Sequence, residues 1–194
     1  VLTKRAAGAC EGRVRGTLRL TDQQILNSEL PANVCMAADG TGWDHSKPIR
    51  LKDGKGIAVA ADGTYGGATV LETKVVGRSD LDGDGKQEIV LSLMCAGSPP
   101  ELCCAGRSSI MTTVSAFVQN GTGLRQVGRS LMGGATPPGD EFGPADRQIW
   151  SVTLRGSTVV TSETIIYPEQ YTFAQAGGAD PAAPVTVEYK LKNG

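Results

Sequence analysis

The chain has 194 residues, 40% hydrophobic and 20% charged, so it is long enough to bury a core and too apolar for a disordered tail. Its 19 lysines and arginines balance 20 aspartates and glutamates, which excludes proteins that bind nucleic acid or anionic membranes through overall positive charge. No apolar stretch approaches the roughly 18 residues that a membrane-spanning helix needs, so we predict no membrane span. The start at Val1 lacks an initiator methionine and an apolar signal core, so we expect a processed, mature chain.

The overall composition favours short strands joined by turns. Aromatic residues make up only 5% of the chain, whereas there are 26 glycines and 10 prolines. Such a mixture is typical of β proteins with many reversals and unlike a bundle of long helices. We therefore predict an all-β fold, a mainly antiparallel sandwich or partly closed barrel with at most one short helix. Residues 1–9 are expected to form an exposed segment, and residues 10–194 a single domain.

The amino-terminal part of the chain predicts one strand and one helix. Residues 12–20 mix apolar side chains with arginines and predict a strand whose outer face is basic. Thr21 and Asp22 offer a helix start, because a hydroxyl or carboxylate accepts the first free amides of a helix. The helix is then expected over residues 23–30, and Pro31 ends it.

The remainder of the chain predicts strands separated by turns. Val, Ile and Thr are frequent in eight segments, as half-buried pleated surfaces require. These segments are 56–60, 68–77, 87–95, 110–119, 124–131, 148–155, 158–167 and 185–191. The sequences at 120–121 and 155–157 predict hairpin turns. Asp-Gly pairs inside the similar stretches 37–42 and 60–66 predict two further tight turns.

The five cysteines indicate disulfide chemistry in an oxidising compartment. None of them has the paired short spacing with histidines that a zinc site needs, which favours a secreted protein. The most economical pairing joins Cys10 to Cys35. Cys95 then pairs with Cys103 or Cys104, and one thiol remains, either buried or joined to another chain.

The segment 80–88 carries the most specific chemical signal in the sequence. It reads Asp-Leu-Asp-Gly-Asp-Gly-Lys-Gln-Glu, which places carboxylates at positions one, three, five and nine and glycine at position six. Calcium takes about six to eight oxygen ligands at about 2.3–2.6 Å, and alternating carboxylates in a curled loop point toward one centre. Position seven adds a backbone carbonyl. The predicted ligands are Asp80, Asp82, Asp84, Lys86 and Glu88.

The residues on both sides of this loop predict strands. Val75 and Val76 precede it, and Ile89 and Leu91 follow it in alternation. An EF-hand would instead have flanking helices and a bidentate glutamate at position twelve, which is Leu91 here. We therefore expect the ion to order a turn between two strands, in a structural role.

The stretch 79–91 resembles the strand, calcium loop and strand unit of FG-GAP and VCBS-type repeats, and the pattern also resembles small secreted proteins of actinobacteria. In those repeats the acidic positions bind calcium, which the resemblance carries over to Asp80, Asp82, Asp84 and Glu88. The resemblance covers residues 68–95 in a single copy. Because a propeller needs several blades, we do not expect a complete β-propeller.

The single histidine restricts the catalytic possibilities. His45 lies between Asp44 and Ser46, but neighbours in a loop seldom face one another as a catalytic triad requires. The chain contains neither a Gly-x-Ser-x-Gly nor a His-Glu-x-x-His sequence. We expect His45 to be an exposed loop residue beside Trp43.

These observations favour a secreted, non-catalytic adaptor that binds another extracellular protein and contains one structural Ca²⁺. Contacts are expected from the long loops 97–108 and 133–147. The expected contact side chains are Lys4, Arg5, Trp43, His45 and Arg107.

Two other functions remain open. A protease inhibitor would present Lys4 and Arg5, or Arg107, as a basic bait. A small carboxylate-dependent hydrolase would use the acidic side chains of the second long loop. These are Asp140, Glu141 and Asp146.

Overall fold

Antiparallel strands dominate the computed structural model of the chain, which describes residues 19–36, 45–59, 67–97, 110–134, 147–165 and 185–191. Within these ranges the strands form a five-stranded, a three-stranded and a two-stranded sheet, none of which closes on itself. Every strand pair is antiparallel. The predicted all-β class is confirmed: the described residues form open packed sheets and one short helix.

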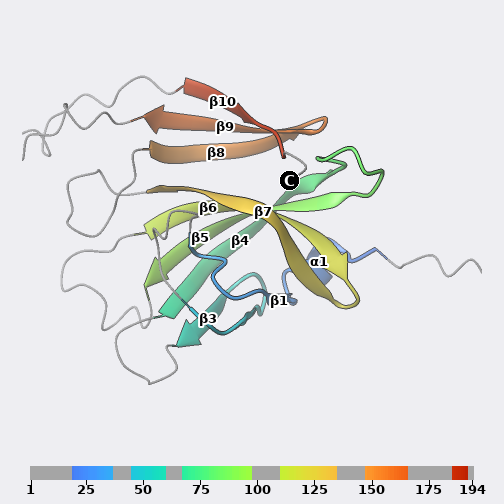
Figure 1. Cartoon of the computed structure of the whole chain (residues 1–194). Coiled ribbons are helices and arrows are strands. Elements are labelled where there is room, and N and C mark those ends of the chain that lie inside the picture. The colour runs from blue at the N-terminus through green and yellow to red at the C-terminus, as the bar shows by residue number, and fades with distance from the viewer. Residues whose placement is uncertain are drawn as a thin grey trace, which may run out of the picture.

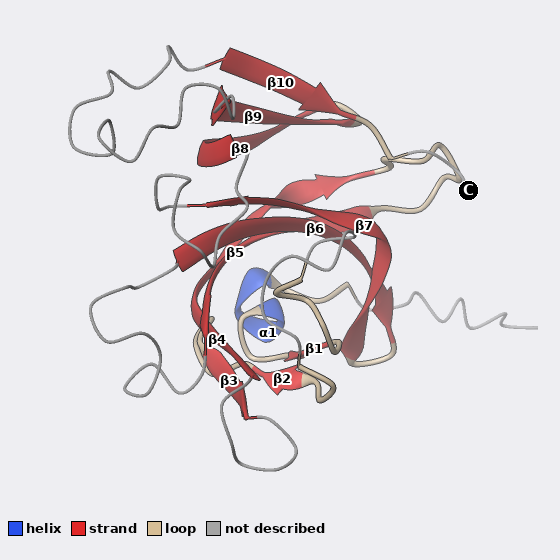
Figure 2. Ribbon diagram, turned by 60° about the vertical axis from the view of Figure 1, so that its left-hand side comes forward, coloured by secondary structure: helices blue, strands red, loops and turns tan. Residues whose placement is uncertain are grey.

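The two larger sheets lie one over the other. The five-stranded sheet has the order β3 (Gly56–Val59), β4 (Gly67–Ser79), β5 (Glu88–Gly97), β6 (Ile110–Asn120) and β7 (Gly123–Gly134). The three-stranded sheet has the order β10 (Val185–Tyr189), β9 (Thr158–Ile165) and β8 (Arg147–Arg155). It covers one face of the larger sheet (Figure 1), and the larger sheet curves around the helix on its other side (Figure 2).

The first four residues of the central strand β5 are buried, and they face two different clusters. Its odd-numbered residues Leu91, Leu93 and Cys95 belong to a core cluster shared with the amino-terminal segment. Val90 points the other way, into a second cluster with residues of β6 and β8. This division follows from the two-residue period of a strand, which sends alternate side chains to opposite faces.

The eight strands predicted after residue 55 are all present. The hairpins are confirmed as well, because Asn120 pairs with Gly123 and Arg155 pairs with Thr158, which leaves two-residue turns. Gly121 and Gly156 have φ values of 62° and 57°, in the left-handed region that glycine adopts without strain. The predicted turns at 37–42 and 60–66 lie outside the described residues, as does the predicted strand at 12–20 except for its last two residues, which are not in a strand.

The helix is shorter than the sequence predicts. Thr21 caps it as expected, forming a capping box with Gln24, but α1 covers only Asp22–Ile25. Residues 29–30 instead form strand β1 (Glu29–Leu30), which pairs with β2 (Ile49–Arg50). Backbone groups after the helix bond to this second segment; for example, the Leu51 amide donates to the Ser28 carbonyl at 2.9 Å. Such tertiary bonds replace a helix that is too short to be stable alone.

A disulfide joins Cys35 to Cys95 and so attaches the amino-terminal segment to β5. The predicted pairs of Cys10 with Cys35 and of Cys95 with Cys103 or Cys104 are therefore wrong. Both bonded cysteines are fully buried in the first core cluster, where packing of the amino-terminal segment on β5 places them together. Cys10, Cys103 and Cys104 lie outside the described residues.

No helix in the described part of the chain has the length and apolarity required to cross a membrane.

Replacing both bonded cysteines (Cys35→Ala with Cys95→Ala) is expected to lower the free energy of unfolding by about 4 kcal/mol. The bond spans a sequence separation of 60 residues, and the lost loop-closure restraint sets this magnitude. Urea unfolding of the wild type and the double variant measures the difference. Peptide mapping without reduction provides the control, since it should recover one peptide with Cys35 joined to Cys95. Equal unfolding midpoints for the two proteins would contradict the prediction.

Candidate metal centre

The acidic loop connects the end of β4 to the start of β5. The two strands remain paired up to its base, where Ser79 lies opposite Glu88. Gly83 and Gly85 have φ values of 80° and 82° within the loop. A residue with a Cβ would be strained at either position, so the sharp turn predicted at Gly85 is present and has a second glycine beside it.

Three of the predicted ligands come together in this loop. Asp80, Asp82 and Glu88 each offer one carboxylate oxygen, and these oxygens all lie within 4.8 Å of one another. Two oxygens bound to one calcium at about 2.3–2.6 Å can be at most about 5 Å apart. The spacing of the three carboxylates therefore suits a single calcium-sized ion between them.

Backbone amides of the loop hold the two aspartates in place. The Asp80 carboxylate accepts hydrogen bonds from the Gly83 amide at 2.7 Å and from the Gly85 amide at 2.9 Å. Asp82 accepts the amide of Asp84 at 3.0 Å. These local side-chain to backbone bonds fold the loop around its own carboxylates, which is a common property of aspartate in turns.

Glu88 is the buried member of the cluster. Only 1% of its surface is exposed, and its Oε2 accepts the Leu81 amide at 2.7 Å. Leu81 is itself buried in the second core cluster, so this bond attaches the loop to the core. Burying an ionised carboxylate costs free energy unless hydrogen bonds and a positive charge compensate it. A cation between the three carboxylates would supply that charge.

Asp84 lies outside this cluster and interacts with Lys86. Its two carboxylate oxygens accept the Lys86 backbone amide at 2.7 Å and the Lys86 ammonium at 3.0 Å. The hydrogen bond from the amide and that from the ammonium lower the pKa of Asp84, and the bond to Asp84 raises the pKa of Lys86. The roles predicted for Asp84 and for the Lys86 carbonyl as ligands stay predictions.

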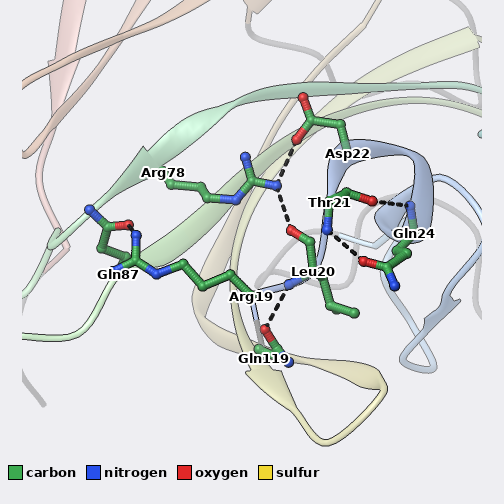
Figure 3. A network of polar contacts seen from close by, with 8 residues as sticks. All are labelled: Arg19, Leu20, Thr21, Asp22, Gln24, Arg78, Gln87 and Gln119. Atoms are coloured by element: carbon green, nitrogen blue, oxygen red, sulfur yellow. Dashed lines mark hydrogen bonds and ion pairs between the residues drawn. The ribbon is translucent and has the colours of Figure 1, made fainter. Parts of the chain in front are cut away.

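Residues 19–22, which lead into α1 and begin it, are bonded to residues next to both ends of the loop (Figure 3). Arg78, just before the loop, donates to the Leu20 carbonyl at 3.0 Å and to the Asp22 carboxylate at 2.6 Å. Arg19 donates to the Gln87 side chain at 2.7 Å, just after the loop. Each exposed bond of this kind contributes little stability alone, but together they align the loop with the amino-terminal segment.

His45 is buried, so the prediction of an exposed contact residue is wrong. Only 2% of its surface is exposed. Its Nδ1 lies 2.9 Å from the Lys47 carbonyl, which can only accept, and its Nε2 lies 3.3 Å from the Cys35 amide, which can only donate. The neutral ring with its proton on Nδ1 satisfies both bonds. His45 thus braces the backbone beside the disulfide.

The other predicted contact and catalytic residues lie outside the described ranges. They are Lys4, Arg5, Trp43, Arg107, Asp140, Glu141 and Asp146. The loops 97–108 and 133–147 also lie outside them, except for residues at their ends that belong to β5, β7 and β8.

An exposed tryptophan on β8 was not singled out by the sequence. Trp150 is 55% exposed, and its indole Nε1 donates to the Thr164 hydroxyl at 2.7 Å. The sequence feature that could have indicated this exposure is the position of Trp150 directly after the apolar Ile149. In an alternating strand the neighbour of a buried residue faces solvent.

Comparison of the chain with protein-family models, with curated proteins and with solved structures gives no match.

Substituting His45→Ala is expected to lower the free energy of unfolding by about 2–4 kcal/mol, because it leaves a cavity and two unpaired backbone groups. Chemical denaturation measures the change. Lys47→Ala is the matched control, because it keeps the carbonyl that His45 bonds and should change stability by less than about 0.5 kcal/mol. Similar stability of the two variants would contradict the structural role of His45.

Proposed function

We propose that this chain is a secreted, non-catalytic binding module in which Asp80, Asp82 and Glu88 hold one structural Ca²⁺. The observation that carries the proposal is the convergence of these three carboxylates, one of them buried, within 4.8 Å. The FG-GAP-like spacing of the loop supports the same ion, because oxygen ligands in a flexible loop suit calcium.

The ion's role follows from where its ligands come from. Two of them lie in the loop and the third, Glu88, is the first residue of β5. Binding one cation would therefore cross-link the loop to the central strand and offset the repulsion among three carboxylates. Order in this loop would extend to residues 19–22 through the hydrogen bonds of Arg78 and Arg19.

A non-catalytic role is supported by the position of the single histidine. His45 is buried, and both ring nitrogens bond to backbone groups, so the usual general base of nucleophilic catalysis is committed to structure. Secretion is supported by the disulfide, because such bonds persist in oxidising compartments. The proposed partner is another extracellular protein, contacted through Lys4, Arg5, Trp43 and Arg107, with His45 now removed from that set.

Calcium at ten times its dissociation constant is expected to raise the melting temperature by about 3–6 °C, which corresponds to about 1.4 kcal/mol. Thermal unfolding in calcium and in chelator measures this shift. Asp82→Asn should abolish it, because it removes a ligand charge from the cluster. Asp84→Asn is the matched control in the same loop and should retain it, since Asp84 interacts with Lys86 instead.

Three results would contradict the calcium proposal. The first is a wild-type melting temperature that calcium does not change. The second is an equal calcium response in Asp82→Asn and the wild type. The third is an equal shift with magnesium, which prefers a smaller octahedral site and should stabilise this loop less.

The binding role predicts that the calcium-loaded chain captures a stoichiometric partner from the extracellular proteins of its source. Mass spectrometry identifies the partner, and the capture is repeated after residues 1–9 are removed and after a chelator is added. We expect weaker capture in both cases, because the first deletes predicted contacts and the second loosens the loop. The absence of any stoichiometric partner would contradict the adaptor role without affecting the calcium site.

A further inference from the structure

A shallow depression lies where β8 crosses the five-stranded sheet. Its volume is about 220 Å³, and we call it the Trp150 depression. The residues that line it include Glu72 and Lys74 of β4, Ser92 and Met94 of β5, and Trp150 of β8. It lies apart from the acidic loop, and no predicted function makes use of it.

A bulge in β4 puts Glu72 into this depression. Val70 pairs with Cys95 and faces the first core cluster, and strict alternation would turn Glu72 into the same cluster. The register shifts between Val70 and Glu72, so Glu72 pairs with Met94 instead. Directly paired residues share a face of the sheet, and Glu72 therefore lies on the exposed side beside Met94.

A second bulge, in β8, positions Trp150. The register shifts between Ile149 and Ser151, so that Ile149 and Val152 both pack into the second core cluster. Trp150 is the extra residue at this shift and points away from the core. Bulges redirect single side chains and are common next to binding sites. Two separate irregularities thus lead Glu72 and Trp150 to line one depression.

The indole is exposed but held in one orientation. Its nitrogen donates to the Thr164 hydroxyl at 2.7 Å, which restricts rotation of the ring, while 55% of the residue remains exposed. An exposed aromatic ring fixed in this way loses little further freedom when a ligand stacks on it. Trp150 therefore has the properties of a preformed stacking surface.

The polar groups around the indole indicate what the ligand is. The depression has one acidic and one basic side chain, Glu72 and Lys74, so its formal charge is zero and favours a neutral ligand. Hydroxyls lie around it as further hydrogen-bonding groups. They belong to Ser92, Thr112 and Ser151.

We propose that the Trp150 depression binds a neutral oligosaccharide. A sugar ring has an apolar C–H face that stacks on an indole and hydroxyls around its edge that bond to carboxylate, ammonium and hydroxyl groups. This activity goes beyond the proposed protein-binding role and is independent of the calcium loop. A protein contact is less suited to the surface, because a contact tryptophan typically fills a partner's pocket, whereas Trp150 lines a depression in this chain.

The test is a fluorescence titration of the variant Trp43→Phe, in which Trp150 is the single remaining tryptophan. The probes are cellotriose, maltotriose and tri-N-acetylchitotriose. We expect at least one of them to change the Trp150 emission saturably. Affinities from calorimetry should then fall at least about tenfold in Trp150→Ala, and less in Trp150→Phe, which keeps a stacking face.

Two further variants keep the proposal falsifiable if Trp150→Ala does not fold. Glu72→Gln changes an exposed side chain and should weaken binding, whereas Ile57→Ala removes an exposed apolar side chain on β3 and should not. No saturable response to any probe up to about 10 mM overturns the proposal. Oligosaccharide binding that neither Trp150→Ala nor Glu72→Gln changes also overturns the proposal. A Trp150→Ala variant that loses binding to a protein partner but keeps its oligosaccharide affinity overturns it as well.

Discussion

The central strand β5 must satisfy two cores at once, and the rest of the molecule depends on that requirement. Leu91, Leu93 and Cys95 pack toward the amino-terminal segment, while Val90 packs toward the three-stranded sheet. A slip of one residue would exchange these two faces and turn each set of side chains away from the cluster that it packs into. The register of β5 with its neighbours β4 and β6 is therefore strongly fixed. The disulfide at Cys95 then attaches the amino-terminal segment to the same strand.

The fixed register also determines the candidate metal centre. Because Ser79 lies opposite Glu88, the loop between them has a set length, and its aspartates fold back toward the start of β5. Glu88 is buried there because the strand that begins with it is buried. The acidic loop is thus more than a solvated turn, since one of its carboxylates is part of the packed structure and bonds to the Leu81 amide in the core. A cation at this position would connect a surface loop directly to the most constrained strand.

Features that depend on neighbouring residues could be predicted from the sequence. The strand segments, the two-residue hairpin turns and the carboxylate spacing of the acidic loop are of this kind, because alternation, turn preference and ligand spacing act within a few residues. The cap at Thr21 is another local feature and was predicted, whereas the end of its helix was not. Residues 29–30 pair with 49–50, and nothing near them in the sequence encodes that contact.

Long-range packing decided the features that the sequence missed. Cys35 joins Cys95 because the amino-terminal segment lies on β5, so pairing by proximity along the chain chose the wrong partners. His45 is buried for the same reason, beside that disulfide. Trp150 and Glu72 come to line one depression through two bulges, and a single extra residue in a strand leaves no clear signal in an alternating pattern. The sequence predicts four carboxylate ligands in the acidic loop; three of them come together, while Asp84 bonds to Lys86 and its role as a ligand stays a prediction.

The most direct test of this account is a calcium titration followed by amide chemical shifts in two-dimensional NMR. The amides of Leu81, Gly83 and Gly85 donate to the clustered carboxylates and report on the site itself. The account predicts that these three signals move together and saturate at one ion per chain, while the amides of Ser92 and Trp150 stay in place. Unchanged signals from the loop, or shifts concentrated in another part of the chain, would contradict it.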